Sequence, residues 1–494
     1  MTLALRPRAA GATLLRWLYD EIRLAIVEGR LQAGARLPST RGIARQYRVA
    51  RGTVVAAFDH LIAEGYIEGN VGSGSFVRRV TTLSSAGSST ASRTRPRAAG
   101  ATPALSVRGR RLASNPFPLR VGGKMHTFRL DNAALDAFPL KTWSRISARC
   151  LRTALPDLLT HGEALGFGPL RAAIAQYVGL TRGVQCTAEQ VVITSGTQSS
   201  LDLIARLVLD PRDRVWVEDP CYTALSSLLR GSGAEVIAVP VDESGVDCEA
   251  GRRRARLAKL ACVTPGCHFP LGATLSLQRR LALLEWAREA GAWIFEDDYD
   301  SQLGFSGRPL AALQSLDRSG CVIYSNSFSK MLFPSLRLGF LIVPQALLGA
   351  VEAARSLLQR FPPVLDQAVL AEFIAAGHME QHMRRMRDLY TMRHDTLVKL
   401  AQQELADVLR LSPLTAGLQA VGWLAAGIPE IETHREAAEQ GILALPLSYL
   451  TLERTLPPGI VLGAAATDLP AIRRGVAQLG VILRRLRASH PVSR

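Results

Sequence analysis

Short apolar runs that end in polar residues recur between positions 191 and 330, and they constrain the fold more than any other feature of the chain. Four of them have the length and composition of buried strands: residues 191–194, 215–218, 293–295 and 322–324. The first leads into a helical pattern with Leu201, Ile204 and Leu207 on one side. Strands joined by helices predict an open α/β sheet, which binds ligands at the carboxyl ends of its strands.

The residues after the first strand have the composition of a phosphate site. Gly196, Thr197 and Gln198 stand where the helix begins. The free N–H groups of a first helical turn favour an anion, and a glycine lets the backbone approach it closely. Taken alone, the same turn is typical of a capped helix without a ligand.

Lys330 and Asp297 complete the chemical pattern. Lys330 closes the run Ser-Phe-Ser-Lys at residues 327–330, and Asp297 follows the strand before it. Pyridoxal 5'-phosphate needs a lysine amine for a Schiff base with its aldehyde, and a carboxylate that keeps its ring nitrogen protonated. A lone lysine among hydroxyls is usually a solvated loop residue, so the prediction depends on the whole set of residues.

Two alternatives bear on the neighbouring residues. Tyr222, in the turn after the second strand, is placed to lie on the pyridine ring, although a core tyrosine is an equal alternative. The acidic run at residues 296–300 could also bind a metal. No histidine recurs nearby at ligand spacing, and Cys262 and Cys267 lack partners for a zinc site, so no metal is expected.

Length and composition predict a large multidomain protein in the cytoplasm. With 494 residues, of which 48% are hydrophobic, the chain can bury two or more cores. It has no stretch of eighteen apolar residues, and its first residues lack the apolar core of a signal peptide. Seven cysteines without paired spacing are typical of reduced thiols. We therefore expect no membrane segment.

Positive charge is concentrated in the first quarter of the chain. Residues 1–80 hold 12 arginines and 6 acids, residues 81–125 hold 8 basic side chains and no acid, and the whole chain has a net charge of +17. Basic side chains gain affinity by displacing counterions from phosphates, which predicts a double-stranded DNA partner; a solvated basic tail is the alternative. Because residues 81–103 are rich in Ser, Thr, Ala, Gly and Pro, we predict a flexible linker over residues 80–125.

The first eighty residues have the element order of a winged helix. Helical spacing predicts helices over about residues 13–28, 39–47 and 51–64, and strands 66–68 and 75–77 flank a glycine-rich hairpin. The third helix is expected to enter the major groove, and the hairpin tip to press on the phosphate backbone. A helical interaction module is the alternative. The expected DNA contacts are Ser39, Arg41, Arg51, Thr53, Gly72 and Gly74.

The motifs of both halves resemble a known family. Residues 13–79 resemble the GntR-type winged helix, residues 126–485 resemble the fold-type-I aminotransferases, and the two in this order resemble the MocR-type regulators. The motifs that carry the resemblance are Leu-Pro-Ser-Thr-Arg at 37–41, Arg-Gly-Thr-Val at 51–54, Glu-Asp-Pro at 218–220, Val-Thr-Pro at 263–265, Glu-Asp-Asp-Tyr-Asp at 296–300 and Phe-Ser-Lys at 328–330. The implied division is a winged-helix domain at 10–79, a linker at 80–125 and an aminotransferase-like domain at 126–490.

The resemblance also implies roles for single residues. Lys330 would carry pyridoxal 5'-phosphate and be the catalytic residue of any transamination, while Asp297 would pair the ring nitrogen and Tyr299 the ring oxygen. Tyr222 would stack on the ring. The phosphate would be surrounded by Gly196, Thr197, Gln198, Ser327 and Arg337. Such proteins are similar to head-to-tail homodimers, and the dimer would read two half-sites of an operator.

Four places depart from the family pattern. Ala50 replaces the usual serine before the third helix and cannot accept its free N–H groups. Near the pocket, Gly-Cys-His at residues 266–268 is unusual, and Gln419 replaces a histidine that could carry a proton. Val461 stands where an arginine often binds the substrate carboxylate. Either the ligand lacks a carboxylate, or another arginine such as Arg308 replaces the missing one.

Two function classes follow from these expectations. The preferred one is a transcription regulator in which a small amine or amino acid, or the cofactor itself, binds at Lys330 and shifts the protein between states of different DNA affinity. The alternative is a working aminotransferase with a DNA-binding appendage, although the missing arginine argues against efficient turnover. A protein that has lost the cofactor is disfavoured, because Lys330, Asp297 and Tyr299 are all present.

Overall fold

The chain forms two compact units, each with its own hydrophobic core. They span Met1–Thr102 and Pro103–Arg494. The structure, a computed structural model, describes residues 3–8, 11–70, 74–78, 104–114, 127–130, 132–153, 160, 162–303, 310–412 and 417–490. None of the helices in these stretches is long and apolar enough to cross a membrane.

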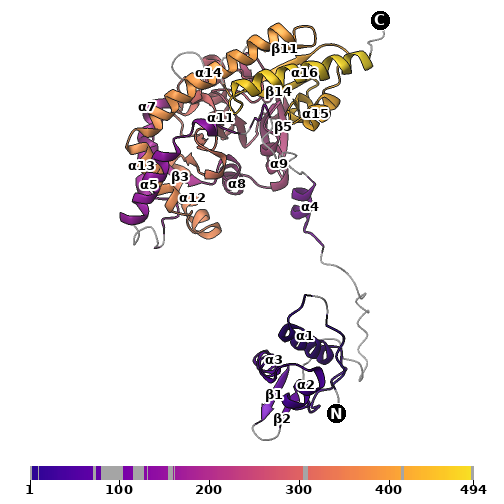
Figure 1. The fold of residues 1–494 in the computed structure, drawn as a ribbon. Helices are drawn as coiled ribbons and strands as arrows, with labels where there is room; N and C mark the ends of the chain where they lie inside the picture. The colour runs from indigo at the N-terminus through magenta and orange to yellow at the C-terminus, as the bar shows by residue number, and fades with distance from the viewer. Residues whose placement is uncertain are drawn as a thin grey trace, which may run out of the picture. The chain divides into compact units, whose positions relative to one another are not determined.

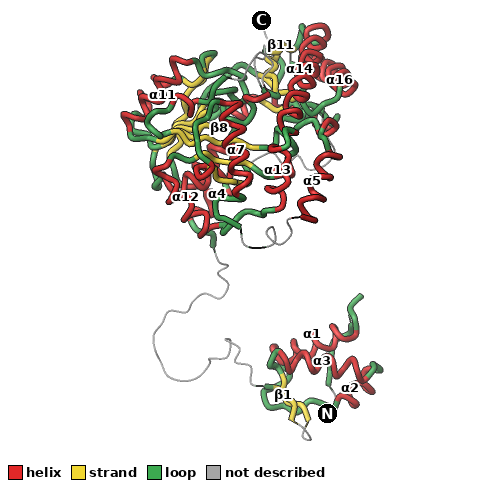
Figure 2. Tube along the Cα trace, turned by 90° about the vertical axis from the view of Figure 1, so that its left-hand side faces the viewer, coloured by secondary structure: helices red, strands yellow, loops and turns green. Residues whose placement is uncertain are grey.

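In its described residues, the first unit has three helices and an antiparallel hairpin, as the sequence predicts (Figure 2). Its core contains Leu18, Ile22, Phe58 and Leu61, which α1 and α3 bury at helical spacing. These residues hold α3 against α1 and leave its other side exposed. The elements are α1 (Leu14–Val27), α2 (Thr40–Tyr47), α3 (Arg51–Ala63), β1 (Ile67–Asn70) and β2 (Gly74–Val77).

The second unit is built on an eight-stranded mixed sheet with the order β3-β10-β9-β8-β7-β4-β5-β6. The strands from β9 to β5 run parallel, β10 is antiparallel to both of its neighbours, and β6 is antiparallel to β5. All four predicted strands are present, which confirms the α/β prediction. The strands are β3 (Val191–Thr194), β4 (Arg214–Asp219), β5 (Glu235–Asp242), β6 (Gly245–Val246), β7 (Leu260–Val263), β8 (Trp293–Asp297), β9 (Val322–Ser327) and β10 (Gly339–Ile342).

Helices cover both faces of this sheet. One face is packed by α8, α9 and α12, and the other by α7, α10, α11 and α13. The sheet is therefore buried on both sides, and its strands contribute apolar residues to both faces. The helices are α5 (Leu140–Thr153), α7 (Gly168–Arg182), α8 (Thr197–Val208), α9 (Thr223–Ser232), α10 (Cys248–Ala255), α11 (Leu277–Ala290), α12 (Gln345–Leu358) and α13 (Leu365–Ala375).

The C-terminal part adds a four-stranded antiparallel sheet with the order β11-β12-β14-β13. Its long helices α14 and α16 lie side by side (Figure 1). Its elements are α14 (His378–Glu404), β11 (Leu409–Leu411), β12 (Gln419–Leu424), α15 (Glu430–Glu439), β13 (Leu445–Pro446), the 3-10 helix η6 (Leu447–Leu450), β14 (Gly459–Gly463) and α16 (Leu469–Ser489).

One helix lies inside the segment that the sequence predicts to be a linker. The helix α4 (Val107–Ala113) packs against α9, and Ser106 caps its N-terminus by accepting the N–H of Gly109 at 3.0 Å. A Cβ at Gly231 of α9 would lie only 2.5 Å from Leu112, so this glycine allows the close approach. This part of the predicted linker is therefore helical and belongs to the second unit, whereas residues 79–103 lie outside the described stretches.

Candidate cofactor site and nucleic-acid interface

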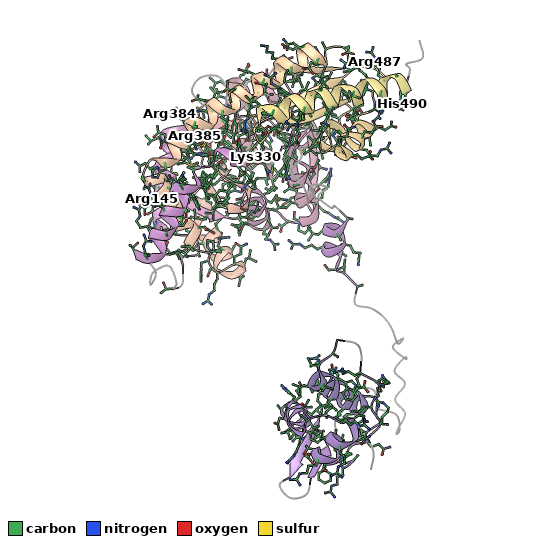
Figure 3. All side chains as sticks on the ribbon, in the orientation of Figure 1. Arg145, Lys330, Arg384, Arg385, Arg487 and His490 are labelled. Atoms are coloured by element: carbon green, nitrogen blue, oxygen red, sulfur yellow. The ribbon has the colours of Figure 1, made fainter. Side chains whose placement is uncertain are left out.

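A cavity of about 300 Å³ opens where β4, β8 and β9 end. Residues from all along the second unit line it, and Lys330 is labelled among the side chains of that unit in Figure 3. The structure brings every residue expected to contact the cofactor into this one cavity. Those residues are Gly196, Thr197, Gln198, Tyr222, Asp297, Tyr299, Ser327, Lys330 and Arg337.

One end of the cavity has the chemistry of an anion site. Gly196 has a φ of +109° just before α8, and a Cβ there would meet the guanidinium of Arg337 at 3.6 Å and the hydroxyl of Ser327 at 3.8 Å. Gly339 of β10 lies so close that its Cβ would stand 2.8 Å from the Gly196 Cα. Glycine at both positions therefore keeps space beside the start of α8, where N–H groups, a cation and a hydroxyl can meet a phosphate.

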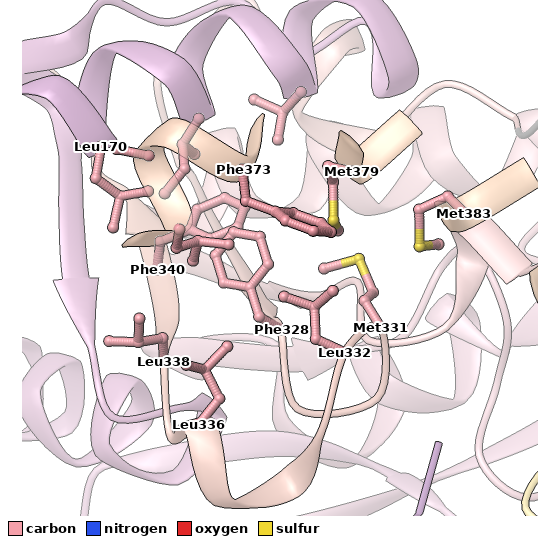
Figure 4. Packing of buried hydrophobic residues seen from close by; sticks show 14 of the residues in the cluster. Leu170, Phe328, Met331, Leu332, Leu336, Leu338, Phe340, Phe373, Met379 and Met383 are labelled. Carbon is pink, nitrogen blue, oxygen red and sulfur yellow. The ribbon is translucent and has the colours of Figure 1, made fainter. Parts of the chain in front are cut away.

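The loop that carries Lys330 is fixed by its apolar neighbours. Phe328, Met331 and Leu332 are buried in one cluster with Phe340 and Phe373 (Figure 4). Because both sides of the loop are packed, Lys330 is held at the cavity. Its Nζ lies 4.2 Å from the centre of the Tyr299 ring, within cation–π range.

Asp297 is a buried carboxyl group that faces the cavity. The hydroxyl of Thr197 donates to its Oδ1 at 3.2 Å. Burial raises the pKa of Asp297 to about 7, against the opposing effects of the Thr197 hydrogen bond and the Lys330 charge. A buried acid of this kind is stabilised as a carboxylate by a further cation, such as a protonated ring nitrogen.

The other acids of the run at 296–300 have structural partners. Asp298 forms a buried ion pair with Arg182 at 2.8 Å and accepts from the Tyr324 hydroxyl. Glu296 accepts the N–H groups of Leu313 and Gln314 at 2.7 and 2.9 Å. These contacts fix the end of β8 and leave Asp297 as the member that faces the cavity. In the described stretches, no three His, Cys, Asp or Glu side chains are grouped to hold a metal ion.

Two of the unusual residues adjoin residues that line the cavity, since Gln419 contacts Tyr299 and His268 precedes Phe269. The amide of Gln419 donates to the Tyr299 hydroxyl at 2.9 Å, so it still orients this tyrosine although it cannot carry a proton. His268 is buried, and its Nε2 lies 3.0 Å from the carbonyl oxygen of Pro220. Burial lowers the pKa of His268 to about 3, so the imidazole is neutral at physiological pH.

Val461 lies in the middle of β14 and is fully buried. It pairs with Val421 of β12 on one side and Leu445 of β13 on the other. All three belong to one apolar cluster, which also includes Leu130 and Leu450 of the cavity wall. Arg308, which the sequence offered as a substitute for the missing arginine, lies outside the described residues.

Half of the residues that line the cavity were not predicted from the sequence. The missed residues are Leu130, Thr223, Thr264, Phe269, Ser329, Pro334, Leu445, Tyr449 and Leu450. Only Ser329 and Pro334 lie in or beside the lysine motif, and Thr264 belongs to the Val-Thr-Pro motif. The tertiary fold brings the segments around positions 130 and 445–450 to the cavity, and no motif in their local sequence predicts this.

The predicted DNA contacts lie on the first unit. Arg41 on α2 and Arg51 on α3 are exposed, and Thr53 is half-buried. Ser39 caps α2 by accepting the N–H of Gly42 at 3.1 Å. Ala50 makes no side-chain cap to α3, as the sequence predicts.

The hairpin brings one further arginine to this surface. Gly74 is exposed with a φ of +102°, and a Cβ there would lie 3.1 Å from the Nε of Arg36. The sequence analysis did not single out Arg36. It comes close to the hairpin because its backbone bridges to Phe76. Gly72, the other predicted hairpin contact, lies outside the described residues.

Comparison with known proteins assigns the winged helix and the cofactor-binding unit to two protein families. Residues 15–77 match the bacterial regulatory proteins of the gntR family, and residues 141–458 match the class I and II aminotransferases. The chain is 38% identical to the probable rhizopine catabolism regulatory protein MocR of Rhizobium meliloti, across 96% of this chain and 94% of that protein. The chain belongs to the MocR-type regulators. This confirms the resemblance drawn from the motifs.

Further relatives of this MocR-type chain are transcriptional regulators by name. The HTH-type transcriptional regulator TauR of Rhodobacter capsulatus is 34% identical and covers 80% of this chain and 81% of its own length. The HTH-type pyridoxine biosynthesis transcriptional regulator PdxR of Corynebacterium glutamicum is 30% identical and covers 94% of each chain.

Solved aminotransferases share the fold of the second unit. The kynurenine aminotransferase of Pyrococcus horikoshii, in complex with PMP, has a TM-score of 0.68 at 25% identity and covers 74% of this chain and 92% of its own. LysN of Thermus thermophilus, complexed with N-(5'-phosphopyridoxyl)-L-leucine, has a TM-score of 0.68 at 27% identity, with 74% and 93% covered. The cofactor of this aminotransferase fold is therefore pyridoxal 5'-phosphate, as predicted.

The residues of this cavity fit that cofactor. Gly196, Ser327 and Arg337 offer an anion site, and the buried Asp297 offers a carboxyl group to the ring nitrogen. Lys330 supplies an amine at the same cavity. The three kinds of group that the cofactor needs thus come together around one space.

Proposed function

We propose that this protein regulates transcription by binding double-stranded DNA through its winged helix and by sensing a small amine or amino acid at pyridoxal 5'-phosphate held by Lys330. The observation that carries the proposal is the convergence of nine expected cofactor residues on one cavity, in a chain that also has a winged helix. A protein with both parts can couple ligand binding to DNA binding if the ligand favours one of its conformations.

Different residues of the cavity would contact different parts of the cofactor. When bound, pyridoxal phosphate supplies an aldehyde that combines with amines and a ring that withdraws electrons. Lys330 would hold it covalently, Asp297 would keep the ring nitrogen protonated, and Tyr299, oriented by Gln419, would donate a hydrogen bond to the ring oxygen. Tyr222 would cover the ring. The phosphate would be bound by Gly196, Thr197, Gln198, Ser327 and Arg337.

The helix α9 offers a route from this cavity toward the linker. Tyr222 and Thr223 line the cavity where α9 begins. Near its other end, Gly231 receives Leu112 of α4, the helix that lies within the predicted linker segment. A ligand that displaces Tyr222 would therefore act on the element to which α4 is attached.

The DNA-binding surface is proposed to include α2, the N-terminus of α3 and the hairpin. Arg41 and Arg51 are exposed there, and basic side chains of this kind contact phosphates and base edges. The proposed contacts are Ser39, Arg41, Arg51, Thr53, Gly72 and Gly74. We further propose a head-to-tail homodimer that reads two half-sites of an operator in the cytoplasm.

A working aminotransferase is the second candidate, because Lys330, Asp297 and Tyr299 meet in one cavity. Val461 argues against efficient turnover. A carboxylate anchor fixes which bond of the substrate stands perpendicular to the cofactor ring, and misplacement costs on the order of 10²-fold in rate. Multiple turnover at roughly 1–10³ per second with common amino-donor and keto-acid pairs would favour the enzyme over the regulator.

The proposal is tested with the full chain loaded with pyridoxal phosphate. A duplex selected from a random library provides the operator, and fluorescence anisotropy gives its Kd with and without each of a panel of amines and amino acids. We expect at least one ligand to shift the visible band of the cofactor and to change the Kd for DNA. A ligand that shifts the band without changing the Kd for DNA would contradict the proposed coupling.

A further inference from the structure

We infer that the ligand sensed at this site is a primary amine with an uncharged, mainly apolar body and no carboxylate beside its amine. The inference rests on the proposed function and names the chemical class of its ligand. Its basis is the apolar part of the cavity lining, none of whose residues belongs to the expected phosphate site.

This wall is built from apolar side chains of widely separated segments. The apolar lining residues that have no expected cofactor role are Leu130, Phe269, Pro334, Leu445 and Leu450. Leu130, Leu445 and Leu450 are buried in one cluster with Phe269 and Val461. Contacts of this kind favour alkyl or aryl groups, because apolar surface gains free energy when it leaves water.

Val461 determines the character of this wall. In the register of the sheet it stands between Val421 and Leu445, and Leu445 lines the cavity. An arginine at position 461 would bring a guanidinium next to Leu445, where it could bind a carboxylate through two parallel hydrogen bonds. Valine instead makes the wall continuous with the apolar cluster behind it.

The charges around the cavity also disfavour a second anion. Among the described lining residues, only Lys330 and Arg337 carry a positive charge. Lys330 is needed for the cofactor, and Arg337 lies beside Gly196 and Ser327 at the anion site. The buried carboxyl groups of Asp297 and Asp300 both interact electrostatically with Lys330. A ligand carboxylate at the apolar wall would thus lose water without gaining a cation from the described lining residues.

The test compares amines with the amino acids that differ from them by one carboxylate. The pairs are 3-methylbutylamine with leucine and 2-phenylethylamine with phenylalanine. Each ligand is titrated into the full chain loaded with pyridoxal phosphate, and the shift of the visible band gives an apparent Kd, expressed per concentration of unprotonated amine. We expect each amine to bind roughly tenfold to hundredfold more tightly than its amino acid, since an unpaired buried carboxylate is penalised.

The outcomes separate this inference from the proposed function. Equal or tighter binding of the amino acids, together with a change in DNA affinity, would overturn the inference and leave the regulator intact. If no amine and no amino acid shifted the band, sensing at Lys330 and the inference would both be wrong.

Two variants test the wall itself. Val461→Arg should bind leucine roughly tenfold more tightly than the wild type does, because it restores a partner for the carboxylate. The control Val461→Leu should keep the preference for amines. Because position 461 is buried, Leu445→Arg provides a second way to place a guanidinium at the cavity. If both arginine variants load the cofactor and neither gains affinity for leucine, this wall does not select the ligand.

Discussion

Replacing Asp297 with asparagine should change the stability of the cofactor-free protein in a pH-dependent way. The folded state raises the pKa of this carboxyl from 3.8 to about 7 by burial. Because the folded pKa lies above the unfolded one, the stabilisation is complete below about pH 4 and is lost as the pH rises through 7. The difference between the folded and unfolded pKa values corresponds to about 4 kcal/mol in the free energy of unfolding, of which about 2–3 kcal/mol is lost between pH 5 and 8. Asparagine is nearly isosteric, and its Oδ1 can still accept from Thr197.

Urea denaturation of the cofactor-free full chain at several pH values measures this effect. We expect the free energy of unfolding of Asp297→Asn, relative to the wild type, to increase by about 2–3 kcal/mol from pH 5 to pH 8. Glu218 and Glu296, whose pKa burial also raises to about 7, titrate in both proteins and largely cancel in the difference. A difference that does not vary with pH would refute the assignment of a strongly raised pKa to Asp297.

The same substitution, Asp297→Asn, should be unfavourable when the cofactor is bound. A protonated ring nitrogen favours the carboxylate, so Asp297→Asn should weaken the binding of pyridoxal phosphate even though it stabilises the cofactor-free protein at pH 8. Glu296→Gln is the matched control, because Glu296 is a buried acid of the same strand that does not line the cavity. Equal affinities of Asp297→Asn and the wild type for the cofactor would mean that Asp297 does not meet the ring.

Three further predictions concern other parts of the chain. Lys330→Ala should lose the visible band and the borohydride-reducible adduct, whereas Lys399→Ala, on the exposed side of α14, should keep both. Arg51→Ala should lose about 1–3 kcal/mol of DNA affinity and relax the preference at one base position, as footprinting on sequence variants would reveal; a uniform loss for all sequences would indicate a phosphate contact instead. Gly231→Leu should displace α4 and speed tryptic cleavage within it, while Gly349→Leu, whose added Cβ meets nothing within 4 Å, should not.

Local patterns were sufficient to predict the winged helix and the central strands. Leu18, Ile22 and Phe58 recur at helical spacing and are buried together, and Ser39 caps α2 as its position predicts. The cofactor residues could be predicted for a related reason. All of them except Arg337 stand at the end of a strand, shortly after one, or at the start of a helix, so neighbouring strands bring them to one edge of the sheet.

The parts that escaped prediction depend on contacts between distant segments. Leu130 and Leu450 line one cavity although 320 residues separate them, and nothing in their local sequence marks them for it. The helix α4 was not predicted because its composition is that of a basic linker. It is held by Leu112 against Gly231, a contact that no local periodicity reveals. The role of Gln419 likewise became visible only through its hydrogen bond to Tyr299.

The central claim is that a ligand bound at Lys330 changes the affinity of the winged helix for DNA. The most direct test measures the Kd of the full chain for its selected duplex with and without 3-methylbutylamine, in the wild type and in Lys330→Ala. We expect a change in Kd for the wild type and none for the variant. An identical response in both proteins, or no response of the wild type to an amine that shifts its visible band, would contradict this claim.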